Sequence, residues 1–359
     1  MKRIIVIGIL TFLIMSTLSW SALSAKKIMP EFLDVSQWIN SDPIERSFIL
    51  GKVIVVHFWS LSSLESLRDM MIVKEWVKKY SVEGVEFIGI HTPLFDFEKD
   101  PKLIEMTLGD LGISHPIAID NDSALWYAYN ALKRPSHYLI DAEGRIRYTY
   151  QGETAYARQE WEIQDLLKES GRSVDLELED YQAEEELKNI RTPTFYLGYR
   201  YLAYFGNDSK IKAEVPEYFK RPPVLYPNRF YLDGKWQIHE ENLESLRPGN
   251  KLSVQYHARS VFVLMGSKSA QPLNVDVLLD GKYLTRENGG FDVSYFEGRS
   301  LFKIDRPRYY HVVDTRDSYG DHLLELVFDR EGAKLFLVSF GGSPLKEKSL
   351  EKLDKINFG

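Results

Sequence analysis

Residues 52–168 alternate between strand-like and helix-like patterns, and this alternation restricts the fold more than any other feature of the sequence. Residues 53–59 form a mostly apolar run rich in β-branched side chains, which is typical of a strand buried on both faces. Residues 85–91 and 116–120 have the pattern of two further short strands. Strands separated by crossover helices predict an α/β layer structure with parallel pairing.

Stretches with helical spacing separate and follow these strands. The first predicted helix has an apolar stripe of Leu64, Leu67, Met71, Val77 and Tyr80, with Trp76 alongside. The second has a stripe of Leu103, Met106, Leu108 and Leu111. The third covers residues 125–132, and the last covers about residues 157–169. A hairpin precedes the last helix, because residues 136–140 and 145–150 flank a turn in which Gly144 can adopt a left-handed conformation. We therefore expect an antiparallel pair to close the parallel sheet.

The pattern changes after a polar and acidic segment at residues 170–191, which is typical of a linker. Beyond Pro193, short strands with alternating apolar residues follow, for example at Leu252, Val254 and Tyr256 and at Val275, Val277 and Leu279. Asp280–Gly281 and Glu331–Gly332 predict two hairpin turns. Strands at this spacing predict an all-β jelly roll or β-sandwich.

The first residues have the composition of an export signal. Two basic residues precede an apolar run over residues 4–18, and small residues then offer a cleavage site after Ser24 or Ala25. An uncleaved N-terminal anchor is the alternative, because the run is close to membrane-spanning length. We therefore expect a periplasmic or otherwise exported protein, which contacts the membrane only if this segment is retained.

The chain of 359 residues thus divides into five expected segments. These are a signal peptide at 1–25, an α/β domain at 26–172, an acidic linker at 173–192, a β domain at 193–345 and a C-terminal tail at 346–359.

The sequence contains no cysteine. Disulfides, cysteine-ligated zinc, iron–sulfur clusters and cysteine nucleophiles are therefore excluded. The formal charge of −7, without any run rich in lysine or arginine, argues against nucleic acid as a partner. The glycines form no phosphate-cradling motif, so we expect no nucleotide and no other cofactor.

The junction between the first strand and its helix, residues 58–68, carries serines at positions 63 and 66. Further motifs occur at residues 38–41, 50–53, 91–93 with Phe95, Phe97 and Glu98, 111–113, 116–122, Trp126 with Tyr129, Pro135 with 137–141, 144–147, 194–200, Trp236, 256–259 and 340–341. Over roughly residues 28–342, this set resembles the C-terminal periplasmic portion of DipZ-type thiol–disulfide exchange proteins, within the TlpA/ResA-like thioredoxin group.

The resemblance implies a thioredoxin-like α/β domain followed by an all-β jelly-roll domain. In this family a C-x-x-C motif occupies the junction, so Ser63 and Ser66 stand at the redox-cysteine positions. The resemblance also implies that Pro135 is a cis-proline facing the active-site helix, although trans is the default for an Arg-Pro bond. Leu94 departs from the family, in which glutamate tends to follow His-Thr-Pro.

Two kinds of polar residue, serine and histidine, are candidates for a catalytic or metal-binding role. A nucleophilic Ser63 would need an adjacent base oriented by a third group, whereas Ser62 or Ser63 can serve simply as a helix N-cap, which is the favoured interpretation. His91, His137 and His257 are expected to be structural, because none belongs to a metal-spaced pair. We therefore expect no catalytic serine and no metal site.

Aromatic residues are concentrated at the start of the β domain. They are Tyr196, Tyr199, Tyr201, Tyr204, Phe205, Tyr218, Phe219, Tyr226, Tyr231 and Trp236. Rings exposed in a row could stack on sugars, but packing in the core and between domains is the favoured interpretation.

Three functions remain open at this point. The favoured one is an exported protein that binds protein or peptide partners of the cell envelope beside Trp59 and Pro135, without redox chemistry, since serine cannot form a mixed disulfide. The second is a thiol–disulfide oxidoreductase whose cysteines are substituted in this chain. The third is a glycan- or protein-binding module that works through the β domain.

Overall fold

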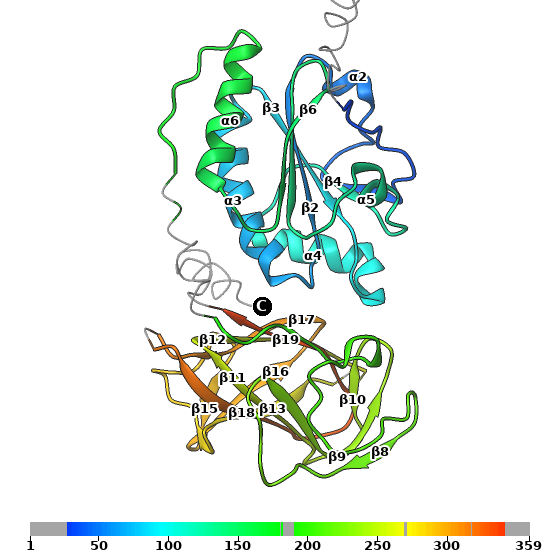
Figure 1. The fold of residues 1–359 in the computed structure, drawn as a ribbon, viewed down its shortest axis with the longest axis vertical. Coiled ribbons are helices and arrows are strands. Elements are labelled where there is room, and N and C mark those ends of the chain that lie inside the picture. Colours follow the sequence, from blue (N-terminus) through cyan, green and yellow to red (C-terminus); the bar gives the residue numbers. More distant parts are fainter. Residues whose placement is uncertain (1–26, 180, 182–189, 269–270, 317, 342–359) are drawn as a thin grey trace, which may run out of the picture.

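The computed structural model describes residues 27–179, 181, 190–268, 271–316 and 318–341. The predicted signal peptide, the predicted C-terminal tail and much of the predicted linker lie outside the described residues. The described chain forms an α/β domain and, below it in Figure 1, an all-β domain. Among the described residues, no helix combines the length and the apolar character needed to cross a bilayer.

A six-stranded sheet forms the centre of the α/β domain. Its strands are β1 (Gln37–Ile39), β2 (Val53–Trp59), β3 (Val85–His91), β4 (Ile117–Ile119), β5 (Ser136–Ile140) and β6 (Ile146–Gln151), in the order β1-β4-β3-β2-β5-β6. The β2, β3 and β4 strands pair in parallel, and the β5–β6 hairpin adds an antiparallel edge, as predicted. The antiparallel edge strand β1 was not predicted, because three residues are too few for a periodic signal.

Helices cover both faces of this sheet. They are α2 (Arg46–Ile49), α3 (Leu64–Tyr80), α4 (Pro101–Leu111), α5 (Ala124–Tyr129) and α6 (Tyr156–Glu169), with a 3-10 turn η1 (Asp96–Lys99) before α4. Alternate residues of β2 point to opposite faces, so that Val53 and Val55 pack in one apolar cluster with α3 and α6, whereas Ile54 and Val56 pack in another with α5. This two-sided burial explains why the strand is apolar along almost its whole length.

The buried face of α3 differs from the predicted apolar stripe. Met70 is fully buried, whereas the neighbouring Met71, which the sequence places in the stripe, is only half-buried. The inner face of the helix also includes two buried polar residues, Ser66 and Asp69. A stripe predicted from apolar residues alone is therefore shifted, because it leaves these polar positions out.

The β domain contains short antiparallel strand pairs. Its strands are β7 (Phe195–Tyr196), β8 (Glu217–Phe219), β9 (Arg229–Ile238), β10 (Leu243–Ser245), β11 (Lys251–Ala258), β12 (Ser260–Ser267), β13 (Leu273–Leu279), β14 (Lys282–Tyr283), β15 (Ser294–Phe296), β16 (Arg299–Ile304), β17 (Arg308–Asp314), β18 (Gly320–Phe328) and β19 (Ala333–Gly341), with a 3-10 turn η4 (Tyr199–Tyr201). One layer runs β15-β16-β13-β18-β11-β9, and the other runs β9-β10-β19-β12-β17. Apolar residues of both layers share one core, which gives the all-β sandwich that the sequence predicts.

The two predicted turns of this domain have different outcomes. Asp280 and Gly281 form the predicted hairpin between β13 and β14, with left-handed φ values of 53° and 76°. The hairpin predicted at Glu331–Gly332 is wrong, because β18 pairs with β11 and β13 in one layer while β19 pairs with β10 and β12 in the other. This turn carries the chain across the sandwich, and a turn motif alone does not reveal whether its two strands pair.

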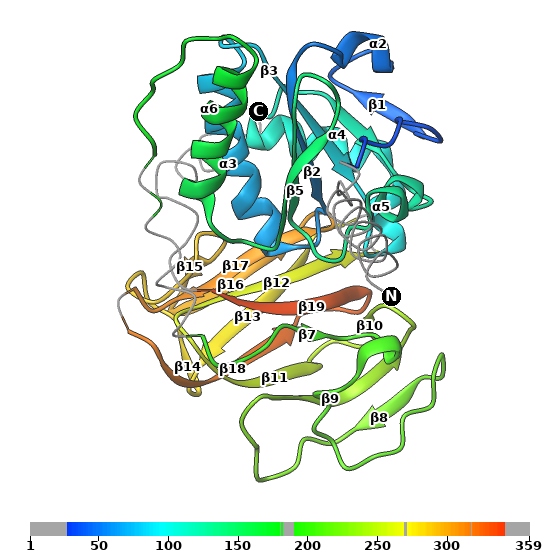
Figure 2. The ribbon, with the colours of Figure 1, turned by 45° about the horizontal axis from the view of Figure 1, so that its top comes forward.

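The β domain lies against the end of the α/β domain where β2 leads into α3 (Figure 2). A shared apolar cluster contains Trp59, Leu61 and Phe95 from the α/β domain and Leu264, Phe336 and Leu337 from the β domain. Polar contacts accompany it, since the Tyr309 hydroxyl donates to the carbonyl oxygen of Ser62 over 2.8 Å and Arg306 pairs with Asp110. The β domain thus covers the junction that carries Ser63 and Ser66.

Candidate functional site

Ser63 is the N-cap of α3. Its backbone is extended, with φ −104° and ψ 111°, and its Oγ accepts a hydrogen bond of 3.1 Å from the backbone N–H of Ser66. A serine side chain here satisfies one of the N–H groups that a helix start leaves unpaired. The predicted cap is therefore confirmed, and it is provided by Ser63.

Ser66 lies on the buried side of the first helical turn. Its side chain is inaccessible to solvent, and its Oγ has no hydrogen-bond partner among the described residues. Ser63 is 7% exposed. Ser63 and Ser66, which the resemblance assigns to the redox-cysteine positions, are thus adjacent at the helix start, and only Ser63 makes a side-chain hydrogen bond in the described structure.

The surroundings of Ser63 are not those of a nucleophile. Its Oγ donates to Oε2 of Glu65 over 3.2 Å, and the described residues place no imidazole within hydrogen-bonding distance of it. A serine nucleophile needs a base that is itself held by a third group. The described contacts of Ser63 therefore support its role as the helix N-cap. They do not provide the base that acyl transfer would need.

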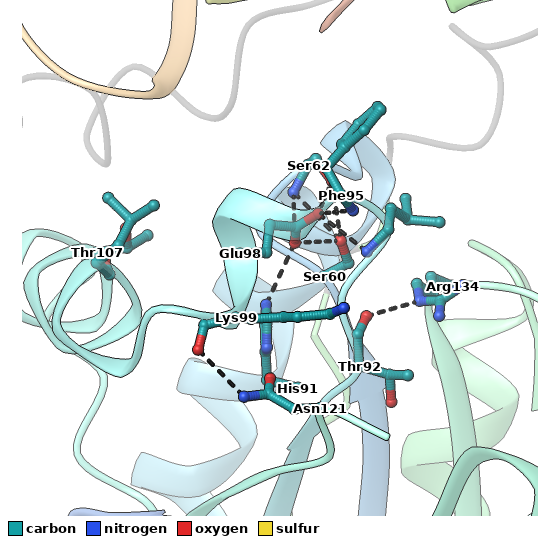
Figure 3. Close-up of polar contacts among 12 residues, drawn as sticks. Ser60, Ser62, His91, Thr92, Phe95, Glu98, Lys99, Thr107, Asn121 and Arg134 are labelled. Atoms are coloured by element: carbon teal, nitrogen blue, oxygen red, sulfur yellow. Dashed lines mark hydrogen bonds and ion pairs between the residues drawn. The ribbon is translucent and has the colours of Figure 1, made fainter. Parts of the chain in front are cut away.

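A buried carboxylate lies directly behind the junction (Figure 3). Oε2 of Glu98 accepts from the hydroxyl of Ser60 at 2.7 Å and from Nε2 of His91 at 3.3 Å. Oε1 accepts from the hydroxyl of Ser62 and from the backbone N–H groups of Leu94 and Phe95, at 3.0 and 3.1 Å. Glu98 therefore links the turn before α3 to the turn after β3.

The hydrogen bonds around Glu98 decide its charge. Complete burial opposes ionisation, but the donors, led by His91, outweigh burial and hold the pKa of Glu98 below its usual value. The group is a buried anion whose lone pairs are well satisfied, and such groups are costly to disturb.

The order of these groups differs from that of a hydrolytic triad. In a triad the imidazole lies between the serine hydroxyl and the carboxylate. Here the carboxylate of Glu98 lies between Ser62 and His91, and it accepts a hydrogen bond from each. The cluster consequently fixes the junction and leaves no free base to activate a hydroxyl.

A cavity of about 390 Å³ opens beside the junction, between the two domains. Its lining comes from the start of α3, from the loops around β3, β5 and β6, and from the β domain: Ser62, Ser63, Glu65, Leu94, Leu132, Lys133, Arg134, Gly152, Glu153, Thr194, Tyr196, Tyr309, Leu337 and Ser339. Leu132 is 78% exposed at its rim. Arg68 holds the rim residue Glu153 through two hydrogen bonds of 2.9 and 2.6 Å. We call this space the junction cavity.

Trp59 and Pro135 lie next to the junction cavity without lining it. The pairing of Phe58 with Ser136 places both residues at the same end of neighbouring strands, and the Arg134–Pro135 peptide bond is cis. Both side chains are buried, and Trp59 belongs to the apolar cluster shared with the β domain. The predicted binding residues Trp59 and Pro135 are therefore not themselves part of the cavity wall, whereas Arg134, the neighbour of Pro135, is.

The three histidines that the sequence singled out have acceptors within reach. His137 lies 3.0 Å from Asp69 and 2.6 Å from Gln159, and His257 lies 2.7 Å from Asp321. Burial lowers the pKa of His137, but the charge of Asp69 outweighs this and raises it overall. Within the described residues, no group of three or more potential ligands could hold a metal ion.

The aromatic residues at the start of the β domain differ in their exposure. Phe219, Tyr231 and Trp236 are buried, and Tyr199, Tyr201, Tyr218 and Tyr226 are exposed. The remaining three, Tyr196, Tyr204 and Phe205, are half-buried. Packing therefore accounts for the buried rings, as predicted, and does not account for the exposed ones.

Comparison with known proteins shows that the chain is similar to thiol–disulfide proteins. Residues 192–341 match the family described as "Thioredoxin like C-terminal domain". Protein DipZ of Mycobacterium tuberculosis and that of Mycobacterium bovis are each 31% identical to the chain over 317 residues, or 87% of its length. The chain is a homologue of DipZ. It spans 42% of the length of the DipZ proteins, across both domains described above.

Two further relatives match the α/β domain. The thiol-disulfide oxidoreductase YkuV of Bacillus subtilis is 28% identical over 142 residues, which cover 40% of this chain and 95% of YkuV. The solution structure of a thioredoxin-like protein in the oxidized form is also 28% identical, covers 40% of this chain and 97% of its own, and superimposes with a TM-score of 0.38. This DipZ homologue itself contains no cysteine.

Sequence reasoning did not assign a role to Glu98 or to Ser60. A partial signal was nevertheless present, because Ser60 directly follows the buried strand β2 and His91 ends the adjacent strand β3, whereas Glu98 lies seven residues further on in η1. The ends of neighbouring parallel strands meet at one edge of a sheet, so Ser60 and His91 could have been expected to meet.

Proposed function

We propose that this protein is an exported, thioredoxin-like binding protein that holds polypeptide partners of the cell envelope in the junction cavity without thiol chemistry. The observation that carries the proposal is the pair Ser63 and Ser66 at the start of α3, beside a cavity open to solvent. Thiol–disulfide exchange passes through a mixed disulfide, which a hydroxyl cannot form. The composition of the first 25 residues supports export.

The lining of the junction cavity suits an extended polypeptide. Leu132 and Leu94 offer apolar contacts, and Tyr196 adds a hydroxyl group to the lining. The hydroxyl groups of Ser63 and Thr194 also line the cavity, where they are hydrogen-bonded to Glu65 and Ser339. Ligand-binding cavities combine apolar contacts with a few polar groups that fix the orientation of the ligand. Because two domains share the lining, we expect the selectivity for partners to depend on both.

Fluorescence polarisation with a labelled, thiol-free peptide tests this proposal, and S-carboxymethylated insulin B chain is a suitable probe. Leu132→Asp should weaken binding about tenfold, because it replaces an exposed apolar contact of the cavity with a charge. Leu33→Asp is the matched control, since Leu33 is exposed elsewhere on the same domain. Equal loss in both variants, or no binding by the unmodified protein, would contradict the proposal.

A second candidate is a thiol–disulfide oxidoreductase whose two cysteines are replaced in this chain. The observation in its favour is that relatives such as YkuV carry that activity in their names. Peptide mass spectrometry of the protein isolated from its natural source distinguishes the two, because cysteines at positions 63 and 66 raise the mass of the peptide that contains them above that of the printed sequence. A mass that agrees with the printed sequence would eliminate this candidate.

A further inference from the structure

A second cavity lies entirely within the β domain. It has a volume of about 530 Å³ and is bounded by the segment between β14 and β15 and by the end of β17. Its lining is Arg286, Gly289, Gly290, Phe291, Val293, Ser294, Tyr295, Asp314 and Arg316. None of these residues lines the junction cavity, so this second cavity is independent of the proposed function.

The backbone around this second cavity is held firmly in place. Gly290 and Asp292 donate backbone hydrogen bonds to Val312 and His311 of β17, both of 3.2 Å, and Asp314 donates one of 3.1 Å to Asn288. A side chain at position 290 would meet the carbonyl oxygen of His311 at 2.1 Å, so only glycine allows this close approach. The cavity is thus formed by the fold itself, before any ligand arrives.

Two aromatic rings form part of its wall. Phe291 and Tyr295 are 38% and 37% exposed, so part of each ring faces solvent. The Tyr295 hydroxyl donates a hydrogen bond of 2.7 Å to the carbonyl oxygen of Thr285, which fixes the ring. A half-exposed, fixed ring offers a face against which the face of a ligand ring can pack.

Two guanidinium groups give the cavity a positive charge. Arg286 and Arg316 line it, and the one acidic group of the lining, Asp314, already pairs with Arg259 over 3.2 Å. Arg316 is anchored by a hydrogen bond of 2.9 Å from its backbone N–H to Asp314 and holds a left-handed φ of 60°. That conformation is uncommon outside glycine and is often retained at binding sites.

We propose that this second cavity binds a ligand that carries an oxyanion, a carboxylate or a phosphate, on a ring. Arg286 and Arg316 would bind the oxyanion, because a guanidinium group matches the geometry of carboxylate and phosphate oxygens. Phe291 and Tyr295 would bind the face of the ring.

Isothermal titration calorimetry on the full chain tests this proposal with glucuronate, glucose 6-phosphate, glucose and inorganic phosphate. The two charged sugars should bind at least about tenfold more tightly than glucose, and the tighter of them identifies the acid group. Arg286→Gln and Arg316→Gln should each weaken that binding about tenfold. Arg330→Gln, at a partly exposed arginine elsewhere in the β domain, is the matched control.

Three results would overturn the proposal. These are no binding of either charged sugar at millimolar concentration, binding that survives both arginine substitutions, and inorganic phosphate that binds as tightly as the charged sugars. Arg286 is exposed, so its substitution should leave the melting temperature unchanged and report on binding alone.

Discussion

The hydroxyl of Tyr309 donates a hydrogen bond of 2.8 Å to the carbonyl oxygen of Ser62, although 247 positions separate the two residues in the chain. Ser62 directly precedes the N-cap of α3 and also binds Glu98. The β domain is therefore attached to the same short turn that, in a thiol–disulfide protein, would carry the reactive sulfur. Access to that turn depends on how the two domains meet.

Removal of the Tyr309 hydroxyl should make the junction more accessible. We expect Tyr309→Phe to raise the alkylation rate of an introduced thiol, Ser63→Cys, by about fivefold, because one hydrogen bond across the domain contact contributes about 1 kcal/mol. The rate is measured with iodoacetamide. Tyr127→Phe, at an exposed tyrosine of the α/β domain, is the control, and equal rates in the two backgrounds would contradict this view of access.

The two junction serines should respond differently to substitution. Ser63→Ala should lower the free energy of unfolding by about 1 kcal/mol, because the helix loses its cap. Ser66→Ala should be neutral or stabilising, because the Ser66 hydroxyl is buried without a partner among the described residues. Urea denaturation measures both, and the prediction fails if Ser66→Ala is the more damaging change.

Glu98 should be more important for stability than any exposed carboxylate of the domain. Glu98→Gln should cost about 3 kcal/mol, because an amide cannot accept all the hydrogen bonds that converge on the carboxylate. Glu105→Gln, on the exposed face of α4, should be neutral. Since the folded-state pKa of Glu98 is lowered, its contribution is present above the usual glutamate pKa and is lost as the pH falls below that value.

A buried histidine pair predicts a second dependence on pH. Nε2 of His57 and Nε2 of His115 lie 2.8 Å apart, and burial lowers the pKa of both, that of His115 from 6.5 to about 4. The unfolded chain therefore takes up protons between pH 6.5 and pH 4 that the folded chain does not, so stability falls across this window as the pH is lowered.

His115→Gln should flatten this slope, which denaturation at several pH values measures. His137 contributes with the opposite sign, because Asp69 raises its pKa: its stabilisation is present at low pH and is lost as the pH rises through the folded-state pKa. The comparison of the variant with the unmodified protein cancels the contribution of His137. An unchanged slope would show that His57 and His115 are not titrated by unfolding.

Much of the α/β domain could be predicted because its signals are local. The buried strand Val53–Trp59, the capped helix after it and the hairpin that contains Gly144 all leave periodic or turn patterns in the sequence. The contact of Tyr309 with Ser62 and the crossing of the sandwich at Glu331–Gly332 leave none. Both depend on how distant segments pack, and neither propensity nor periodicity carries that information.

We infer that the junction has the geometry of a thiol-exchange site without its sulfur. The most direct test of this inference is the rate of insulin reduction by dithiothreitol, with the unmodified protein and with the double variant Ser63→Cys/Ser66→Cys. We predict no catalysis by the unmodified protein, and clear catalysis by the double variant through a disulfide between positions 63 and 66. A double variant that folds but forms no such disulfide, or that leaves the rate unchanged, would contradict the claim.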